Sequence, residues 1–162
     1  MDLSIVVSVY NEEESLRELI HWIKESLEGE ELEYEIILID DGSTDTSWEI
    51  IEDLSADYPI KAISFRRNYG KSAALFCGFE KAQGDIVVTM DADLQDSPEE
   101  IPAMIKMIRE EGYDLVSGWK KRRHDGFFSK NLPSKIYNSA ARFVTKIKLH
   151  DMNCGLKAYR RE

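Results

Sequence analysis

The chain has few cysteines, few prolines and no long apolar run. Its two cysteines, Cys77 and Cys154, cannot form a disulfide framework, and we expect free thiols in a reducing compartment. The longest stretch without a charged side chain covers residues 3–11, whereas a membrane-spanning helix needs about 20 mostly apolar residues. No basic segment followed by an apolar one opens the chain, as a secretory leader would. We therefore expect a cytoplasmic protein in which none of the 162 residues crosses a membrane.

The composition is that of one globular domain. With 43% hydrophobic residues and only four prolines, the chain can bury a substantial core, which excludes disorder and collagen-like repeats. No segment has the composition of a linker between two domains. We therefore expect residues 1–162 to form a single domain.

Positive charge is concentrated in one segment of an acidic chain. The net charge is −10, yet residues 120–148 carry nine basic side chains and one acidic one, whereas residues 1–119 carry nine basic and 28 acidic. A local positive field attracts anionic ligands whatever the total charge is. The segment is either a solvated face or a binding site for an anion. Nucleic acid is not an expected partner, because the acidic remainder would repel its phosphates.

Short apolar runs alternate with segments of helical period. The runs are rich in β-branched residues and have the length of strands. This alternation predicts an α/β fold, in which a mostly parallel sheet carries helices on both faces. The expected strands cover residues 3–9, 34–39, 60–64, 85–90 and 114–117, and the expected helices cover residues 14–27, 46–56, 71–82 and 98–111.

Acidic residues follow three of the predicted strands. The first strand leads into Tyr10-Asn11-Glu12, the second into Asp40-Asp41-Gly42-Ser43, and the fourth into Asp91-Ala92-Asp93-Leu94-Gln95. Parallel strands bring their carboxyl ends to one edge of a sheet, where ligands bind. Carboxylates that converge there raise one another's pKa unless a cation or hydrogen-bond donors compensate them. We therefore expect a binding site at this edge.

Asp91 and Asp93 are the candidate ligands of a metal ion. Two carboxylates spaced two residues apart at the end of a buried strand can bind one Mg2+ or Mn2+, which keeps open positions for phosphate oxygens. Gln95 adds a neutral oxygen. An EF-hand is excluded because its sixth position, a glycine, is Asp96 here. A P-loop is excluded because the glycine that it requires five positions before Gly70 is a phenylalanine.

Together the motifs resemble those of family 2 glycosyltransferases with the GT-A fold. Within that family the similarity is greatest to the polyprenyl-phosphate sugar transferases, such as the dolichol-phosphate mannosyltransferases. The resemblance covers essentially the whole chain, and five motifs in the same order are more specific than any one of them. The motifs are Val7-Ser-Val-Tyr-Asn-Glu12, Ile39-Asp-Asp-Gly-Ser43, Asn68-Tyr-Gly-Lys71, Met90-Asp-Ala-Asp-Leu-Gln95 and His150-Asp-Met-Asn-Cys-Gly-Leu-Lys-Ala-Tyr-Arg160.

The resemblance implies a nucleotide diphosphate sugar, linked to UDP or GDP, as the donor. Residues 1–119 would then be the donor-binding core, with the metal set Asp91, Asp93 and Gln95. Asp93 would also be catalytic through the metal. The implied donor-binding residues are Ser8, Tyr10, Glu12, Ile39, Asp41, Lys71, Asp91, Ala92 and Asp93.

The resemblance places the acceptor side in residues 120–162. Lys120, Lys130 and Ser134 match positions that contact the phosphates of donor and acceptor. Asp151 is either a catalytic base for a hydroxyl acceptor or a residue that positions the basic segment. A phosphate acceptor needs little help from a base, because its oxygen is already anionic near neutral pH. The basic segment could also hold the domain against an anionic membrane surface.

The sequence thus predicts an inverting enzyme that moves a hexose from the donor to an acceptor, with polyprenyl phosphate favoured. One alternative is transfer to a saccharide hydroxyl in the synthesis of a cell-surface polysaccharide. Another is a donor-binding module without turnover, because family members continue beyond the last motif and we expect the natural chain to extend past Glu162. The full-length protein would work at the cytoplasmic face of the membrane. A phosphatase of the haloacid type is disfavoured, since Gln95 stands where that class has Thr or Val.

Overall fold

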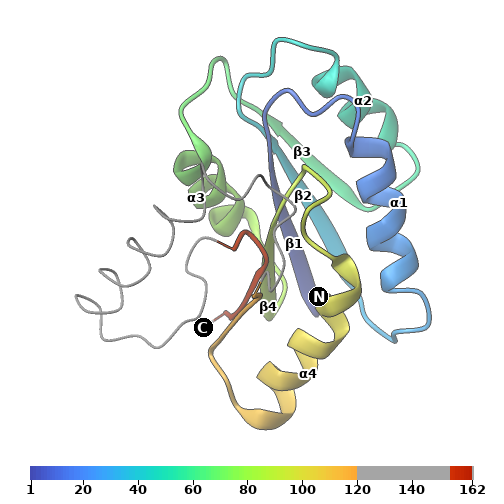
Figure 1. Ribbon diagram of the computed structural model, residues 1–162, viewed down its shortest axis with the longest axis vertical. Coiled ribbons are helices and arrows are strands. Elements are labelled where there is room, and N and C mark those ends of the chain that lie inside the picture. Colours follow the sequence, from blue (N-terminus) through green and yellow to red (C-terminus); the bar gives the residue numbers. More distant parts are fainter. Residues whose placement is uncertain (120–153, 162) are drawn as a thin grey trace, which may run out of the picture.

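The computed structural model describes residues 1–119 and 154–161, which contain a six-stranded sheet and four α-helices (Figure 1). The strands are β1 (Leu3–Val9), β2 (Tyr34–Asp40), β3 (Ile60–Ser64), β4 (Ile86–Asp91), β5 (Leu115–Ser117) and β6 (Lys157–Arg160). The helices are α1 (Leu16–Ser26), α2 (Ser47–Leu54), α3 (Lys71–Lys81) and α4 (Ile101–Glu111), and a 3-10 turn at Pro98–Glu100 precedes α4. No helix within these two ranges has the length and apolarity needed to cross a membrane.

Four parallel strands form the main part of the sheet, in the order β3-β2-β1-β4. In their register Ser8 of β1 lies opposite both Ile39 of β2 and Asp91 of β4. The carboxyl ends of β1, β2 and β4 therefore meet at one edge. The predicted α/β class with a mostly parallel sheet is confirmed, and this register brings the three acidic strand ends together.

The sixth strand is absent from the sequence prediction. β6 pairs antiparallel with β4, and β5 pairs antiparallel with β6 rather than lying beside β4. The four residues Lys157-Ala-Tyr-Arg160 are too short and too polar for a periodicity signal, and only Ala158 is fully buried. This strand matters for the site because Gly155, two residues before it, lies against the end of β4.

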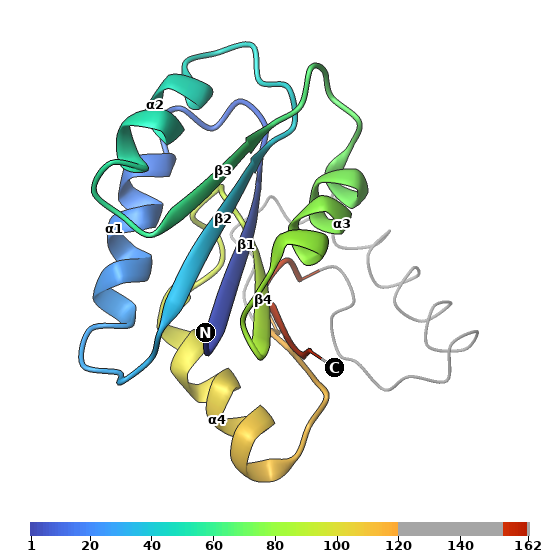
Figure 2. The same ribbon diagram turned by 180° about the vertical axis from the view of Figure 1, so that it is seen from behind.

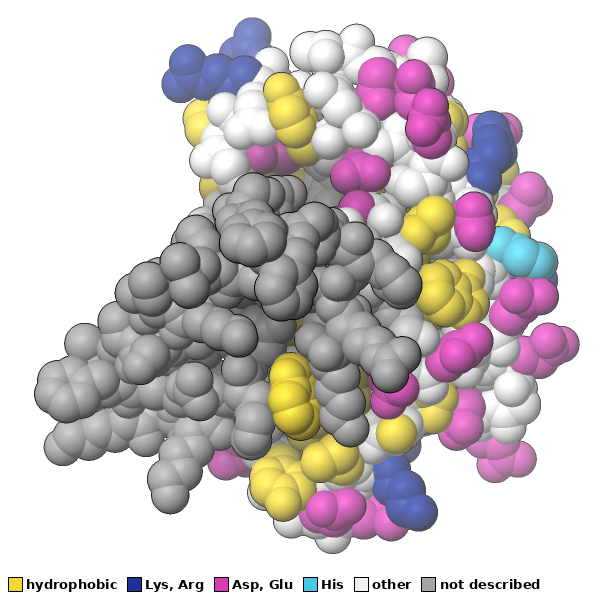
Figure 3. Space-filling model, in the orientation of Figure 1, with side chains coloured by type: hydrophobic (Ala, Val, Ile, Leu, Met, Phe, Trp, Pro, Cys, Tyr) yellow, Lys and Arg dark blue, Asp and Glu magenta, His cyan; other side chains and the backbone are white. Residues whose placement is uncertain are grey.

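Helices cover both faces of the sheet, as expected. Alternate residues of β1 point to opposite sides: Ile5 and Val7 pack in a large core with α1, α2 and α4, whereas Val6 packs in a small core with α3. Figures 1 and 2 show α3 on the face of the sheet opposite to α1 and α2. In Figure 3 acidic side chains gather along the right-hand margin, over α1.

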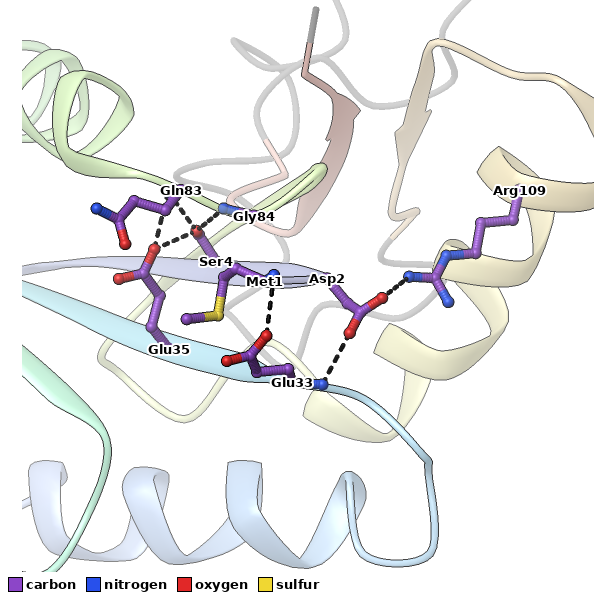
Figure 4. A network of polar contacts seen from close by, with 8 residues as sticks. All are labelled: Met1, Asp2, Ser4, Glu33, Glu35, Gln83, Gly84 and Arg109. Atoms are coloured by element: carbon purple, nitrogen blue, oxygen red, sulfur yellow. Dashed lines mark hydrogen bonds and ion pairs between the residues drawn. The ribbon is translucent and has the colours of Figure 1, made fainter.

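A buried carboxylate fastens the opposite, amino edge of the sheet (Figure 4). Glu35 is only 3% exposed. Its Oε1 accepts hydrogen bonds from the Ser4 hydroxyl at 2.7 Å and from the Gln83 N–H at 2.8 Å, and Lys61 Nζ lies 2.6 Å from Oε2. Burial alone raises the pKa of Glu35, but the bonds from Lys61, Ser4 and Gln83 outweigh burial and hold that pKa below its usual value.

The lowered pKa of Glu35 predicts a loss of stability in acid. A carboxyl group whose pKa is lower in the folded state stabilises the fold above its unfolded pKa, and this contribution disappears as the pH falls through the folded pKa. Glu35→Gln should cost about 1–3 kcal/mol at pH 7, because a hydrogen-bonded buried charge is lost. Its free energy of unfolding should then change less than that of the wild type between about pH 5 and pH 3.

Urea denaturation across this pH range measures both effects. Glu33→Gln is the matched control, because the side chain of Glu33 is 71% exposed and its loss should change stability by less than about 0.5 kcal/mol at pH 7. Parallel pH profiles for the wild type and Glu35→Gln would contradict the assignment.

Candidate functional site

A cleft of about 330 Å3 opens at the carboxyl edge of the parallel strands. It contains every donor-binding residue predicted from the sequence except Ile39. Ile39 is instead fully buried in the small core beneath α3. The lining residues are Ser8, Val9, Tyr10, Glu12, Asp41, Asn68, Lys71, Asp91, Ala92 and Asp93.

Asp41 holds the loop that leads into α3. Its Oδ1 accepts a hydrogen bond from the Tyr69 N–H and its Oδ2 accepts one from the Gly70 N–H, both at 2.8 Å. The residue is only 3% exposed. Gly70 has φ +92°, a conformation that favours glycine. The carboxylate predicted to bind a nucleoside therefore first fixes the point at which α3 begins.

The first residue of α3 extends its side chain to the candidate metal site. Lys71 Nζ forms an ion pair with Asp91 Oδ1. The two side chains are 48% and 27% exposed, so the pair lies at the mouth of the cleft rather than in the core. The sequence predicted both residues as donor-binding, but it did not predict their contact.

Two further residues restrain Asp91, and sequence reasoning missed both. Its backbone N–H donates to Asp96 Oδ2 at 3.1 Å, and Asp96 is only 2% exposed. A Cβ atom at Gly155 would lie 2.6 Å from Asp91 Oδ2 and 2.7 Å from Asp96 Oδ2. Gly155 belongs to the motif that covers residues 150–160, but its contact with Asp91 could not be predicted without knowing where β6 lies. The carboxylate of Asp91 thus lies between Lys71 on one side and the backbone of Gly155 on the other.

Asp93 and Gln95 line different pockets. Asp93 is exposed in the cleft, where its Oδ1 accepts a hydrogen bond from the Gln95 N–H at 3.1 Å. Gln95 instead lines a separate pocket of about 540 Å3, together with Met104, Trp119 and other residues. Leu94, between them, has φ +60° and turns the chain. Of the predicted metal set, the cleft therefore contains Asp91 and Asp93 but not Gln95.

The carboxylate oxygens of the cleft suit a hard divalent cation that also binds a ligand. Residues 1–119 and 154–161 contain no cluster of three or more His, Cys, Asp or Glu side chains able to hold a metal. Mg2+ typically uses one or two carboxylates and completes its coordination with water and phosphate oxygens. Asp91 and Asp93 match that requirement. The predicted residues Lys120, Lys130, Ser134 and Asp151 lie outside the part of the chain that the structure describes.

A second hollow of about 490 Å3 adjoins the cleft and shares Tyr10 and Asn68 with it. Its lining includes Arg66 and Arg67, neither of which was predicted from the sequence as a site residue. Arg67 lies over the ring of Tyr69, 5.0 Å from its centroid. This hollow therefore adds positive charge, besides that of Lys71, to the acidic carboxyl edge of the sheet.

Sequence comparison identifies relatives over nearly the whole chain. The profile of the family described as "Glycosyl transferase family 2" matches residues 4–162. An undecaprenyl-phosphate 4-deoxy-4-formamido-L-arabinose transferase of Pseudomonas syringae pv. syringae is 44% identical over 98% of the chain and 47% of the relative. The transferase of the same name from Proteus mirabilis is also 44% identical, over 98% and 49%. The chain thus spans about half the length of these curated relatives.

Solved structures show the same fold at lower identity. Glucosyl-3-phosphoglycerate synthase from Mycobacterium tuberculosis, in complex with Mn2+, UDP-glucose and glycerol 3-phosphate, has a TM-score of 0.74 at 22% identity and covers 98% of this chain and 56% of its own. The mannosyltransferase PcManGT from Pyrobaculum calidifontis, in complex with GDP-Man and Mn2+, has a TM-score of 0.69 at 23% identity, with coverage of 98% and 44%. The predicted GT-A fold is confirmed.

The close approach of Gly155 to Asp91 predicts the effect of adding a single methyl group. Gly155→Ala should displace the Asp91 carboxylate and lower the affinity for Mn2+ at least about ten-fold, and the overpacking should cost about 1–3 kcal/mol of stability. Manganese titration followed by electron paramagnetic resonance, together with urea denaturation, measures both.

Gly112→Ala provides the control for that experiment. Gly112 ends α4 with φ +76° and has no atom within 4 Å of its Cβ position. Alanine there should cost about 1–2 kcal/mol through backbone strain without changing the affinity for Mn2+. Wild-type affinity in Gly155→Ala would show that this approach does not position Asp91.

Proposed function

The chain belongs to glycosyl transferase family 2, and we propose that it is the donor-binding part of an enzyme that transfers a sugar from a nucleotide diphosphate sugar to polyprenyl phosphate. One observation carries the proposal. The cleft at the carboxyl edge of the sheet brings together predicted residues of β1 and β4, of the segments that follow β1, β2 and β4, and the first residue of α3. A nucleotide diphosphate with a bound divalent cation suits this cleft, because the cation can bind the two carboxylates and the diphosphate at the same time.

The proposed acceptor follows from the relatives at 44% identity, whose name specifies undecaprenyl phosphate. It also agrees with the basic segment 120–148, where Lys120, Lys130 and Ser134 remain the predicted phosphate contacts. The name of the relatives specifies a formamido-arabinose, whereas the resemblance to the family led us to expect a hexose. Both are therefore donors to test.

Five side chains of the cleft have a task in this proposal. Tyr10 is 46% exposed at the mouth, where its ring can pack against a nucleobase, and Glu12 can accept hydrogen bonds from base or ribose. Asp91 and Asp93 would hold Mg2+ or Mn2+, which when bound supplies Lewis-acid stabilisation of the departing diphosphate. Lys71 adds a positive charge beside the same phosphates.

The reaction requires positioning more than proton transfer. An acceptor phosphate is anionic near neutral pH, so a direct in-line displacement with inversion needs the acceptor held close to the anomeric carbon. Asp151 would then position the basic segment, and it would be a base only for a hydroxyl acceptor. We place the reaction at the cytoplasmic face of a membrane, where residues 120–148 would also meet anionic lipid.

Transfer and donor binding test the proposal together. With Mn2+, undecaprenyl phosphate and a panel of UDP- and GDP-linked sugars, the protein should form a labelled sugar phospholipid that extracts into organic solvent. Asp93→Ala should reduce transfer at least about 100-fold, because Asp93 is one of two carboxylates for the cation, while stability changes by less than about 0.5 kcal/mol at this exposed position.

Glu111→Ala is the matched control: it removes an exposed acid at the last residue of α4, which does not line the cleft, and it should leave transfer unchanged. A labelled glycan in place of a sugar phospholipid would overturn the acceptor. Full transfer by Asp93→Ala would overturn the metal site. Failure of the wild type to bind any nucleotide, measured by calorimetry, would overturn the proposal itself.

A further inference from the structure

The contact between Lys71 and Asp91 places a lysine on a carboxylate that a metal ion needs. Lys71 Nζ pairs with Asp91 Oδ1, and both residues line the cleft that also holds Asp93. A cation bound by Asp91 and Asp93 would therefore find one of its carboxylates already paired. Either the cation binds without using Asp91 Oδ1, or Lys71 dissociates from that oxygen.

The surroundings of Asp91 favour departure of the lysine. The carboxylate cannot turn away freely, because its Oδ2 lies against Gly155, where a Cβ atom would approach within 2.6 Å. Its backbone is tied to Asp96 by a hydrogen bond of 3.1 Å. Lys71, by contrast, is 48% exposed on a flexible four-carbon stem. Asp91 is thus the fixed partner and Lys71 the movable one.

The backbone of Lys71 stays in place when its side chain moves. Asp41 holds the N–H groups of Tyr69 and Gly70, both at 2.8 Å, and these residues directly precede Lys71. The backbone of Lys71 therefore stays fixed at the edge of the cleft, and its ammonium group can move only as far as the side chain reaches. After leaving Asp91 it is either in water or, when a ligand occupies the cleft that Lys71 lines, within reach of that ligand.

We infer that Lys71 and a divalent cation bind the Asp91 carboxylate in turn, so that entry of the cation releases Lys71 to the diphosphate of the donor. The inference rests on the proposed function, which supplies the diphosphate. In the protein without ligand, Lys71 neutralises Asp91 and competes with the cation. With donor present, the diphosphate accepts the lysine, and competition is relieved.

This exchange couples the two ligands. The cation binds weakly alone, because it must displace Lys71 into water, and more tightly when a diphosphate receives the lysine. By thermodynamic reciprocity the nucleotide gains the same factor from the cation. Direct contact between metal and phosphate also produces coupling, so the contribution of Lys71 is the part that disappears when its charge is removed.

The test compares Mn2+ affinity with and without nucleotide in three variants. Lys71→Met removes the charge and keeps most of the length, Lys71→Arg keeps the charge, and Lys81→Met is the control at the last residue of the same helix. Mn2+ is titrated by electron paramagnetic resonance, alone and with saturating UDP or GDP, whichever the wild type binds more tightly. Circular dichroism checks that each variant is folded.

Lys71→Met should bind Mn2+ alone at least about three-fold more tightly than the wild type. Its coupling factor, the ratio of the Mn2+ dissociation constants without and with nucleotide, should fall about ten-fold, within the usual range of coupling between ligands. Lys71→Arg should retain most of the wild-type coupling, and Lys81→Met all of it.

The outcomes separate this inference from the proposed function. If the wild type binds Mn2+ and nucleotide cooperatively and Lys71→Met behaves identically, the exchange is overturned while the proposed function stands. Weaker binding of Mn2+ alone by Lys71→Met would likewise overturn it, since the lysine would then assist the cation. A wild type that binds neither Mn2+ nor nucleotide would overturn both.

Discussion

Mutual repulsion among carboxylates is the constraint that organises the carboxyl edge of this sheet. Parallel pairing brings Asp40, Asp41 and Asp91 to one edge, and Asp96 follows closely. Each is compensated by the protein itself. Asp40 accepts from the Ser43 N–H and the Ser64 hydroxyl, Asp41 from two backbone N–H groups, Asp91 pairs with Lys71, and Asp96 accepts from the Asp91 N–H. The loops at this edge adopt conformations that place these N–H, hydroxyl and ammonium groups next to the carboxylates.

Much of this arrangement could be predicted because the parallel strands carry strong local signals. Runs such as Ile86–Met90 are apolar, β-branched and bounded by acids, so strand ends and their clustering follow directly. The acidic motifs then identify the cleft, in which all the predicted donor residues but Ile39 gather. Ile39 does not line the cleft, because successive side chains of a strand point to opposite faces of the sheet and the side chain of Ile39 faces α3.

The features that escaped prediction depend on contacts between distant segments. β6 is too short for periodicity, and without it nothing places Gly155 beside Asp91, 64 positions earlier in the chain. Gln95 follows Asp93 by two residues, yet the left-handed turn at Leu94 directs it to another pocket. The pairing of Lys71 with Asp91 depends on where Asp41 fixes the start of α3. Each is a property of the assembled edge rather than of a motif.

Because hydrogen bonds and an ion pair within the protein compensate the acids at this edge, the domain can fold without a metal ion. A structural metal site spends its ligands on holding the chain together, and its loss unfolds the domain. Here Asp40, Asp41 and Asp96 perform that structural task with hydrogen bonds, which leaves Asp91 and Asp93 at the cleft. Asp91 is held by a mobile lysine rather than by backbone donors alone, so its partner can change without disturbing the loops. In the proposed function, the cation would therefore bind together with the nucleotide diphosphate instead of holding the fold together.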